Sequence, residues 1–334
     1  MSDFERAALR LAFVQAHLGN NASEPVAASS DAGFRSYWRT RSGDGRSAIV
    51  MDSPPGLDDV RPWLRLHALF DAGGVRVPTV LACDVDAGFL LLEDLGGQTL
   101  LQIIDADNAA TWFDHALDQL LRIQRIALPD DFPAYTDALV RRELALFSDW
   151  FLERHLGVEL DANEQAALGR IFDHLATAFL AQPQVPVHRD FMPRNLMPLT
   201  DGLAVLDFQD AVRGPLAYDV LSCFKDAFLS WPQSRIDAWT ARWRDAMRDA
   251  GLAVPAAEAF ARDLDLTGVQ RHLKVLGIFA RLKHRDGKPH YIVDAPRFVA
   301  YLDAILPRHP ELASLHTLLQ RRVLPAIQPM ALPQ

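Results

Sequence analysis

Residues 188–207 constrain the fold of this chain more than any other stretch. They begin with HRDFMPRN and end with a short apolar run, residues 203–206, before Asp207. Asp190 is followed five positions later by Asn195 and twelve positions after that by Asp207. A short apolar run after a turn predicts a buried strand. Such a strand would end at Asp207 and hold its side chain in a defined place.

These three side chains are the groups that phosphoryl transfer from a metal-bound nucleotide requires. Asp190 can accept the proton of an attacking hydroxyl, while Asn195 and Asp207 offer oxygen ligands to Mg²⁺. A single Asp near Pro more often only forms a turn. The complete series, however, matches a kinase signature. We therefore predict Asp190 as the catalytic base and Asn195 and Asp207 as metal ligands; the candidate substrate contacts beside them are Arg194, Gln209 and Asp210.

The same stretch, together with Gly214-Pro215 and Tyr218-Asp219, resembles the aminoglycoside phosphotransferase and choline kinase-like family. The resemblance extends over nearly the whole chain. It implies an α+β, protein-kinase-like bilobal fold with ATP and Mg²⁺ as cofactors. Residues 1–94 would form a small, β-rich, nucleotide-binding N-lobe. Residues 95–334 would form a large, mainly helical C-lobe with the catalytic loop, the metal site and the sugar pocket.

Within this family, the sequences HRDFMPRNLM and LDFQDAVRGPLAYDV are similar to those of a group of sugar kinases. Those kinases phosphorylate the anomeric (C1) hydroxyl of N-acetylmuramate and N-acetylglucosamine in peptidoglycan recycling, so the resemblance implies this activity. Two alternatives stay open. The acceptor could be an aminoglycoside or another small alcohol, or the chain could be a nucleotide-binding pseudokinase scaffold.

The N-terminal part predicts a β-hairpin, because polar and apolar residues alternate over residues 37–41 and return over residues 48–51. In the family, the loop before this hairpin covers the nucleotide phosphates. The family's hinge, whose backbone groups would pair with adenine, falls at Glu93 and Leu95. The candidate nucleotide contacts of the loop and hairpin are Ser30, Gly33, Phe34, Arg35 and Arg39.

The N-terminal part also departs from the kinase pattern. Protein kinases place a Lys on the third strand to hold the α- and β-phosphates, yet the first Lys of this chain is Lys225. A guanidinium also binds phosphate well. Arg35 and Arg39 are therefore the candidates for this contact. The missing Lys is also the feature that supports the pseudokinase alternative.

Candidate sugar contacts lie on two predicted helices. Arg271, Lys274 and Arg281 occur at helical spacing, and their charges suit an acidic sugar better than a polycationic aminoglycoside. Trp150 could stack on a sugar ring or pack in the core. Asp219 is expected to brace the catalytic loop through Arg189, and His188 is expected to pack and form hydrogen bonds.

Composition limits the possible partners and compartments. The net charge of −9 argues against binding to nucleic acid. Cys83 and Cys223 are the only cysteines, and we expect two buried free thiols. Residues 1–20 mix charged and apolar side chains, unlike a signal peptide, and no apolar run is long enough to span a membrane. We expect a cytoplasmic protein, a monomer or weak dimer, that binds an amino sugar and ATP.

Overall fold

The computed structural model describes residues 2–30, 34–225 and 228–327. The chain divides into two compact units, one of residues 1–126 and 193–211 and one of residues 127–192 and 212–334. The first unit contains a five-stranded sheet, and the second is mainly helical. The predicted α+β fold class is confirmed. The predicted division of nucleotide and sugar roles at residue 94 stays a prediction.

The sheet of the first unit is antiparallel, with the strand order β1-β2-β3-β5-β4. Its second and third strands are the predicted hairpin, in which Ser36 pairs with Asp52 and Arg41 with Ser47. The alternation in the sequence therefore located both strands correctly. The strands are β1 (Val26–Ser30), β2 (Ser36–Arg41), β3 (Ser47–Asp52), β4 (Val80–Asp84) and β5 (Phe89–Glu93).

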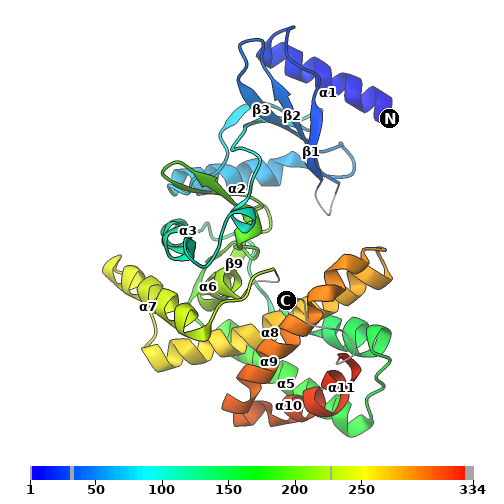
Figure 1. Cartoon of the computed structure of the whole chain (residues 1–334), viewed down its shortest axis with the longest axis vertical. Helices are drawn as coiled ribbons and strands as arrows, with labels where there is room; N and C mark the ends of the chain where they lie inside the picture. Colours follow the sequence, from blue (N-terminus) through cyan, green and yellow to red (C-terminus); the bar gives the residue numbers. More distant parts are fainter. Residues whose placement is uncertain (1, 31–33, 226–227, 328–334) are drawn as a thin grey trace. The chain divides into compact units, whose positions relative to one another are not determined.

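Helix α1 (Asp3–Leu18) packs against this sheet (Figure 1). It begins with a capping box, in which the side chains of Ser2 and Glu5 each accept a hydrogen bond from the other residue's backbone N–H. Phe13 and Val14 are buried in one apolar cluster with residues of β3 and β5. This contact fixes which face of the sheet is covered by α1.

The first unit also contains a hairpin of strands β7 and β8, which belongs to the predicted metal-binding stretch. The backbone N–H of Val205 donates a hydrogen bond to the carbonyl oxygen of Arg76 at 2.7 Å. The ring of Phe208 packs against those of Trp63 and Phe70 on helix α2, with centroids 5.1 and 5.4 Å apart. The hairpin is therefore fixed to the unit that contains the sheet. The elements are α2 (Val60–Ala72), η1 (Leu100–Gln102), α3 (Ala109–Gln124), η3 (Pro193–Asn195), β7 (Leu196–Leu199) and β8 (Gly202–Val205).

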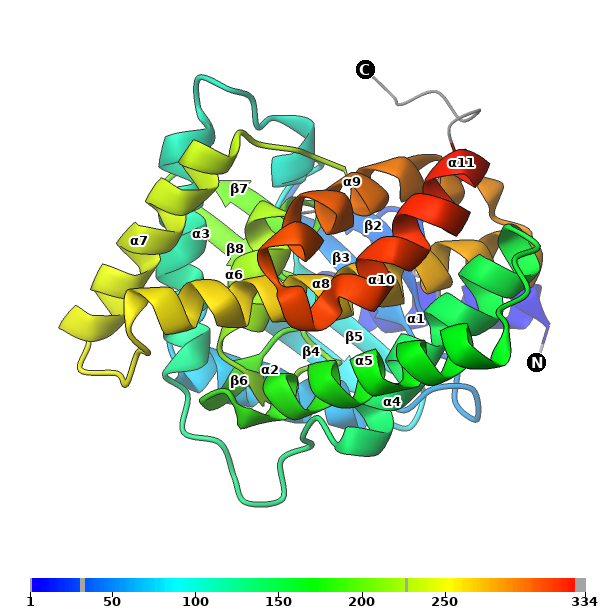
Figure 2. The same ribbon diagram turned by 90° about the horizontal axis from the view of Figure 1, so that it is seen from below.

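Helix α8 (Ala257–His284) is the longest helix that the structure describes in the second unit. It packs against α9 (Ala295–Ile305), as Figure 2 shows. Gly277 allows a close approach to the preceding helices, because a Cβ there would lie 2.3 Å from the backbone of Leu146. The other elements of this unit are α4 (Asp137–Leu146), η2 (Phe147–His155), α5 (Ala162–Ala181), β6 (Gln184–Val187), β9 (Val212–Pro215), α6 (Ala217–Phe224), α7 (Gln233–Asp249), η4 (Pro289–Asp294), α9 (Ala295–Ile305), η5 (Leu306–Arg308), η6 (Pro310–Leu312), α10 (Ala313–Leu318), η7 (Leu319–Val323) and α11 (Leu324–Ile327).

One expectation about the cysteines was wrong. Both are free thiols, but only Cys223 is buried, whereas Cys83 is exposed. Cys83 lies on the edge strand β4, in which every residue is exposed or half-buried. Within the described residues, no helix is both long enough and apolar enough to cross a membrane.

Candidate functional site

The segment after β6 carries the predicted catalytic base. Strand β6 pairs with β9 and ends at Val187, directly before His188. The side chain of His188 is fully buried, and its Nδ1 accepts a hydrogen bond from the backbone N–H of Asp190 at 3.3 Å. His188 therefore packs and forms a hydrogen bond as predicted. Its contact holds the backbone of Asp190, whose own side chain is half-buried.

Asp219, in the first turn of α6, fixes the backbone of this catalytic loop. Its carboxylate oxygens accept hydrogen bonds from the backbone N–H groups of His188 at 2.6 Å and Arg189 at 3.0 Å. Arg189 has a φ of 77°, a conformation that costs a non-glycine residue about 1–3 kcal/mol. The two hydrogen bonds stabilise this backbone, which confirms the predicted bracing role. Burial raises the pKa of Asp219 to about 7, although both backbone donors favour its charged form.

Glu143 on α4 is the centre of a buried charge network that the sequence did not predict. Its Oε1 accepts from Nζ of Lys274 at 2.8 Å and from Nη2 of Arg189 at 3.1 Å. Lys274 also donates to the hydroxyl of Tyr218 at 3.0 Å, and Nε2 of Gln270 donates to Oε2 of Glu143 at 3.1 Å. The network joins α4, α6 and α8 to the side chain that precedes the predicted base.

The network keeps Lys274 charged inside the second unit. Burial lowers the pKa of Lys274, but Tyr218 and Glu143 outweigh this effect and raise it above its ordinary value. The sequence contained a signal for the buried acid: Glu143 follows Val140 by three residues and directly precedes Leu144. These three are the buried residues of α4. A carboxylate at helical spacing between two apolar residues indicates a buried acid that needs a cation.

The predicted metal ligands lie together at the base of the β7–β8 hairpin. The backbone N–H of Leu206 donates to the carbonyl oxygen of Asn195 at 2.9 Å. Nδ2 of Asn195 lies 3.4 Å from Oδ2 of Asp207, and Nε2 of Gln209 donates to Oδ1 of Asp207 at 2.5 Å. Asp207 has a φ of 64°, which turns the chain directly after the strand. The predicted substrate residue Gln209 is therefore a neighbour of the metal-ligand carboxylate.

This pair of side chains fits Mg²⁺. Mg²⁺ prefers oxygen ligands and usually takes one or two carboxylates, with water and phosphate oxygens completing its shell. Rotation of the Asn195 amide by half a turn exchanges its nitrogen and oxygen, so both residues can present oxygen. Among the residues that the structure describes, no group of three or more His, Cys, Asp or Glu side chains could hold a metal ion. Asn195 and Asp207 stay the predicted magnesium ligands.

The predicted nucleotide residues of the first unit are held by specific partners. Nε of Arg35 donates to Asp58 at 2.5 Å, and Nε of Arg39 donates to Asp94 at 2.7 Å. The side chain of Glu93 accepts from Arg76 and from the backbone and hydroxyl of Thr79, and its backbone N–H donates to the Thr79 carbonyl at 2.9 Å. The side chain and the backbone N–H of Glu93 are thus already bonded. The predicted pairing with adenine therefore depends on the other backbone groups near Glu93 and Leu95.

Three loop residues remain to be placed. Phe34 is exposed, with 64% of its surface accessible. Ser30 ends strand β1, whose backbone pairs with Ser36, and its side chain is outside the described part of the structure. Gly33 lies outside the described residues. The predicted contacts of these residues with nucleotide stay predictions.

The predicted sugar residues fall in different environments. Arg271 is 3% exposed, and the described residues provide no ion pair for its guanidinium, whose Cζ lies 5.9 Å from the ring centre of Tyr218. Arg281 and Trp150 are half-buried, while Arg194 and Asp210 are exposed. Burial lowers the pKa of Arg281. Arg194, Gln209 and Asp210 belong to the first unit, and Asp190, Trp150, Arg271, Lys274 and Arg281 belong to the second.

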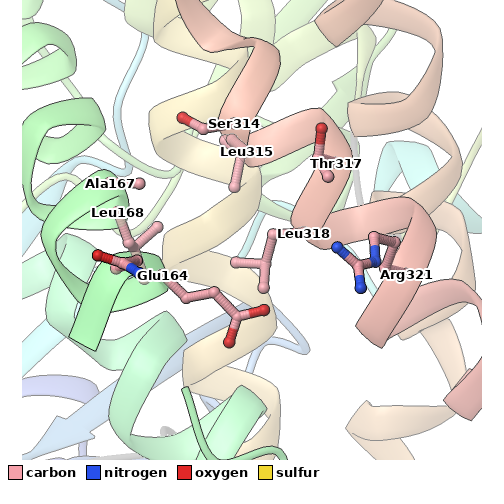
Figure 3. A pocket seen from close by; sticks show the side chains of 9 residues that line it. Glu164, Ala167, Leu168, Ser314, Leu315, Thr317, Leu318 and Arg321 are labelled. Atoms are coloured by element: carbon pink, nitrogen blue, oxygen red, sulfur yellow. The ribbon is translucent and has the colours of Figure 1, made fainter. Parts of the chain in front are cut away.

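The second unit also has a surface hollow of about 260 Å³ between α5 and α10 (Figure 3). Glu164 and Arg321 lie on opposite sides of it with Leu318 between them, and Leu168 and Leu315 also line it. The carboxylate of Glu164 is bonded to Arg322 at 3.1 Å. None of the predicted site residues lines this hollow, so it is separate from the catalytic loop.

Comparisons with known proteins agree with the motifs. The model of the phosphotransferase enzyme family matches residues 25–264. A protein from Pseudomonas aeruginosa named N-acetylmuramate/N-acetylglucosamine kinase is 51% identical over 298 residues, 89% of this chain and 88% of that protein. A protein of the same name from Neisseria meningitidis is 42% identical over 297 residues, 87% of this chain and 88% of its own.

Solved structures agree on the fold. A choline kinase from Streptococcus pneumoniae aligns with 90% of this chain and 99% of its own, at a TM-score of 0.62 and 14% identity. An ADP-bound aminoglycoside phosphotransferase aligns with 90% of this chain and 98% of its own, at a TM-score of 0.60 and 12% identity. These likenesses support the protein-kinase-like α+β fold. By its sequence and its fold, the chain belongs to the phosphotransferase enzyme family.

Proposed function

We propose that this protein is an ATP-dependent kinase that phosphorylates the anomeric hydroxyl of N-acetylmuramate and N-acetylglucosamine. The observation that carries this proposal is the 51% identity, over 298 residues, to a relative named for those two sugars. The predicted base, Asp190, and the predicted metal ligands, Asn195 and Asp207, are present in the chain. The product would be a sugar 1-phosphate, and the reaction would belong to peptidoglycan recycling.

Asp190 would act on the acceptor hydroxyl. Its carboxylate accepts the proton as the sugar oxygen bonds to the γ-phosphorus of ATP, and the bond from that phosphorus to the bridging oxygen breaks to release ADP. The transition state of this transfer is loose, so positioning and charge neutralisation supply most of the rate. His188 and Asp219 serve positioning, since they hold the backbone of the base itself and of the two residues directly before it.

Asn195 and Asp207 would hold Mg²⁺, which supplies positive charge to the phosphate oxygens when bound. The hydrogen bond from Gln209 orients the carboxylate of Asp207. This leaves the opposite carboxylate oxygen, Oδ2, on the side of Asn195. The carboxylate and the amide can then share one ion.

Arg271 is the best candidate for recognition of an acidic sugar. N-acetylmuramate carries a carboxylate that N-acetylglucosamine lacks, and a guanidinium binds carboxylate well. Lys274 is already paired with Glu143. The charge of Arg271 instead acts on the buried carboxylate of Asp219, where it opposes the effect of burial and helps to lower the pKa, without a salt bridge among the described residues. A cationic side chain also disfavours an aminoglycoside, which is itself a polycation. We keep Arg281 and Trp150 as further candidates.

The remaining proposals concern the setting of the enzyme. We propose a cytoplasmic monomer or weak dimer that binds neither nucleic acid nor membrane, in keeping with its net charge of −9. A pseudokinase role is disfavoured by the presence of Asp190, Asn195 and Asp207.

One experiment tests the proposed function. The protein is incubated with ATP, Mg²⁺ and a panel of amino sugars and aminoglycosides, and NMR locates the phosphate on any product. Phosphate at C1 of the two N-acetylated sugars is expected. Asp190→Asn should reduce turnover by orders of magnitude and leave ATP binding nearly unchanged. Phosphate on an aminoglycoside alone, or full turnover by Asp190→Asn, would contradict the proposal.

A further inference from the structure

Protein kinases place a phosphate-binding lysine on the third strand, but β3 of this chain contains no lysine. Val50 of β3 is buried in the cluster with Phe13 and Val14 of α1. Because successive side chains of a strand point to opposite faces, Met51 lies on the face away from α1. Met51 is fully buried and apolar. This strand therefore offers the phosphates of a nucleotide no cation on that face.

The register of the hairpin identifies a substitute. Tyr37 of β2 pairs directly with Met51, so these two side chains share a face. Arg35 lies two residues before Tyr37, at the end of the hairpin next to the predicted phosphate loop. With continued alternation it belongs to the same face as Met51. Arg35 is then two residues along the chain from the Tyr37–Met51 pair.

Arg35 is held by a carboxylate as a kinase lysine would be. Its Nε and Nη2 donate to the two carboxylate oxygens of Asp58 at 2.5 and 3.2 Å. The hydroxyl of Ser53 donates to the same carboxylate at 2.7 Å. The Arg35 and Asp58 side chains are 14% and 24% exposed, so the pair is largely shielded but still reachable. The ion pair and the hydroxyl lower the pKa of Asp58, which stays charged despite the opposing effect of burial.

Asp58 also connects this pair to the predicted metal site. It stands two residues before α2, and the same helix packs through Trp63 and Phe70 against Phe208. Phe208 directly follows Asp207, the predicted magnesium ligand. In protein kinases the Lys–Glu pair and the metal-binding Asp must both be in place for catalysis. Here the segment from Asp58 to Phe70 contacts Arg35 at its start and Phe208 through α2.

Arg39 shares this face by the same rule and is also two residues from Tyr37, but in the other direction along β2, towards the turn of the hairpin. It pairs with Ile49, which in turn pairs with Leu92 one residue before Glu93. Its guanidinium is bonded to Asp94 and to the carbonyl oxygen of Gly96. Arg39 therefore belongs to the predicted hinge end, where adenine rather than phosphate would bind.

We propose that Arg35 supplies the cation that binds the α- and β-phosphates of ATP, and that Asp58 is the residue that positions it. The pair would take over the role of the Lys–Glu pair of other kinases. This inference depends on the proposed use of ATP, but not on the identity of the sugar.

Calorimetric titration with MgATP, MgADP and adenosine, without sugar, tests the assignment. Loss of a bidentate, charge-assisted contact in Arg35→Gln should weaken binding of both nucleotides by about 10–100-fold and leave adenosine binding unchanged. Arg35→Lys should keep part of the affinity. Arg61→Gln is the matched control, because Arg61 is exposed on α2 and paired only with surface carboxylates; it should bind all three ligands as the wild type does.

The role of Asp58 has its own readout. Asp58→Asn retains the guanidinium of Arg35 but removes the carboxylate that holds it in position. The value of kcat should therefore fall more than the affinity for MgATP, and Asp58→Glu should recover part of kcat. A purely structural role would instead lower the melting temperature and weaken adenosine binding as well.

Three results would overturn the inference: wild-type nucleotide affinity in Arg35→Gln, equal loss of adenosine binding, or a selective loss of phosphate binding in Arg39→Gln alone. Failure of the wild type to phosphorylate any sugar would contradict the proposed function and leave this inference standing if MgATP binding still depended on Arg35.

Discussion

Replacing Glu143 by Gln tests the buried charge network in the second unit. The substitution preserves the shape of the side chain and removes its charge. It removes the anion that Lys274 and Arg189 share through Oε1 at 2.8 and 3.1 Å. The Glu143 side chain is 6% exposed and that of Lys274 is 11% exposed, so water compensates little for the loss.

The expected cost follows from this geometry. Breaking a buried ion pair by removing one partner costs about 3–5 kcal/mol, because the remaining charge stays buried. The second unit has roughly 190 residues, for which 1 kcal/mol corresponds to a shift of about 2–4 °C in Tm. Glu143→Gln should therefore lower the melting temperature of this unit by roughly 6–20 °C. Lys274→Met should cost less, since Glu143 keeps its contacts with Arg189 and Gln270.

Differential scanning calorimetry measures these shifts. The matched control is Glu164→Gln, which changes the same chemical group in an ion pair with Arg322 on the surface of the same unit. Such pairs contribute little, so the control should melt close to the wild type. The double variant of Glu143→Gln with Lys274→Met should be more stable than the sum of the two single losses predicts, because one unpaired cation is gone.

Two outcomes would refute this reasoning. One is a Glu143→Gln protein that melts no lower than Glu164→Gln. The other is strict additivity of the Glu143 and Lys274 variants, which would show that their side chains are not coupled in solution.

Three further perturbations have defined outcomes. Asp219→Asn can accept only one of the two loop hydrogen bonds, so kcat should fall about tenfold or more while the KM for ATP changes little, as steady-state kinetics would show. Gly277→Ala places a Cβ 2.3 Å from the Leu146 backbone, whereas Gly169→Ala meets no atom within 4 Å; thermal melts should show a large loss for the first and a gain of about 0.5–1 kcal/mol for the second. Burial lowers the pKa of His155 to about 4, so below pH 6.5 the unfolded chain binds a proton at this residue that the folded chain does not. The free energy of unfolding should therefore decline as the pH falls from 6.5 towards 4. Thermal melts across this range should show a smaller decline for His155→Gln.

The sequence predicted those parts of the molecule that depend on local pattern. Strands β2 and β3 followed from alternating residues close in the chain, and residues 203–206 formed the expected strand within one position. The bracing role of Asp219 was also predicted. Its carboxylate acts through the backbone N–H groups of Arg189, as predicted, and of His188. The strands were predictable because they depend on periodicity between residues close in the chain, and the role of Asp219 was predictable because it belongs to the recognised motif.

The sequence could not predict the pairing of charges across the second unit. Lys274 was recognised as a cation on a helix, but its partner Glu143 lies far away in the sequence, and no local pattern connects them. The same limit applies to Arg35 and Asp58, which meet only because the loop after β3 folds back beside β2. Helical spacing therefore identified charged residues correctly and left open whether they bind a ligand or each other.

Strand β3 explains why the cation for a nucleotide has to come from elsewhere in the first unit. Its last residue, Asp52, is 2% exposed and accepts hydrogen bonds from both Arg6 and Arg10 of α1 at 2.7–2.8 Å. The two guanidinium groups also lie over aromatic rings of the sheet, 3.9 and 3.5 Å from the ring centres. The carboxylate of β3 thus anchors α1 on one face, and the opposite face presents Met51. The only charged side chain of β3 is therefore an anion that is already paired with two arginines of α1, so this strand offers no cation to a phosphate.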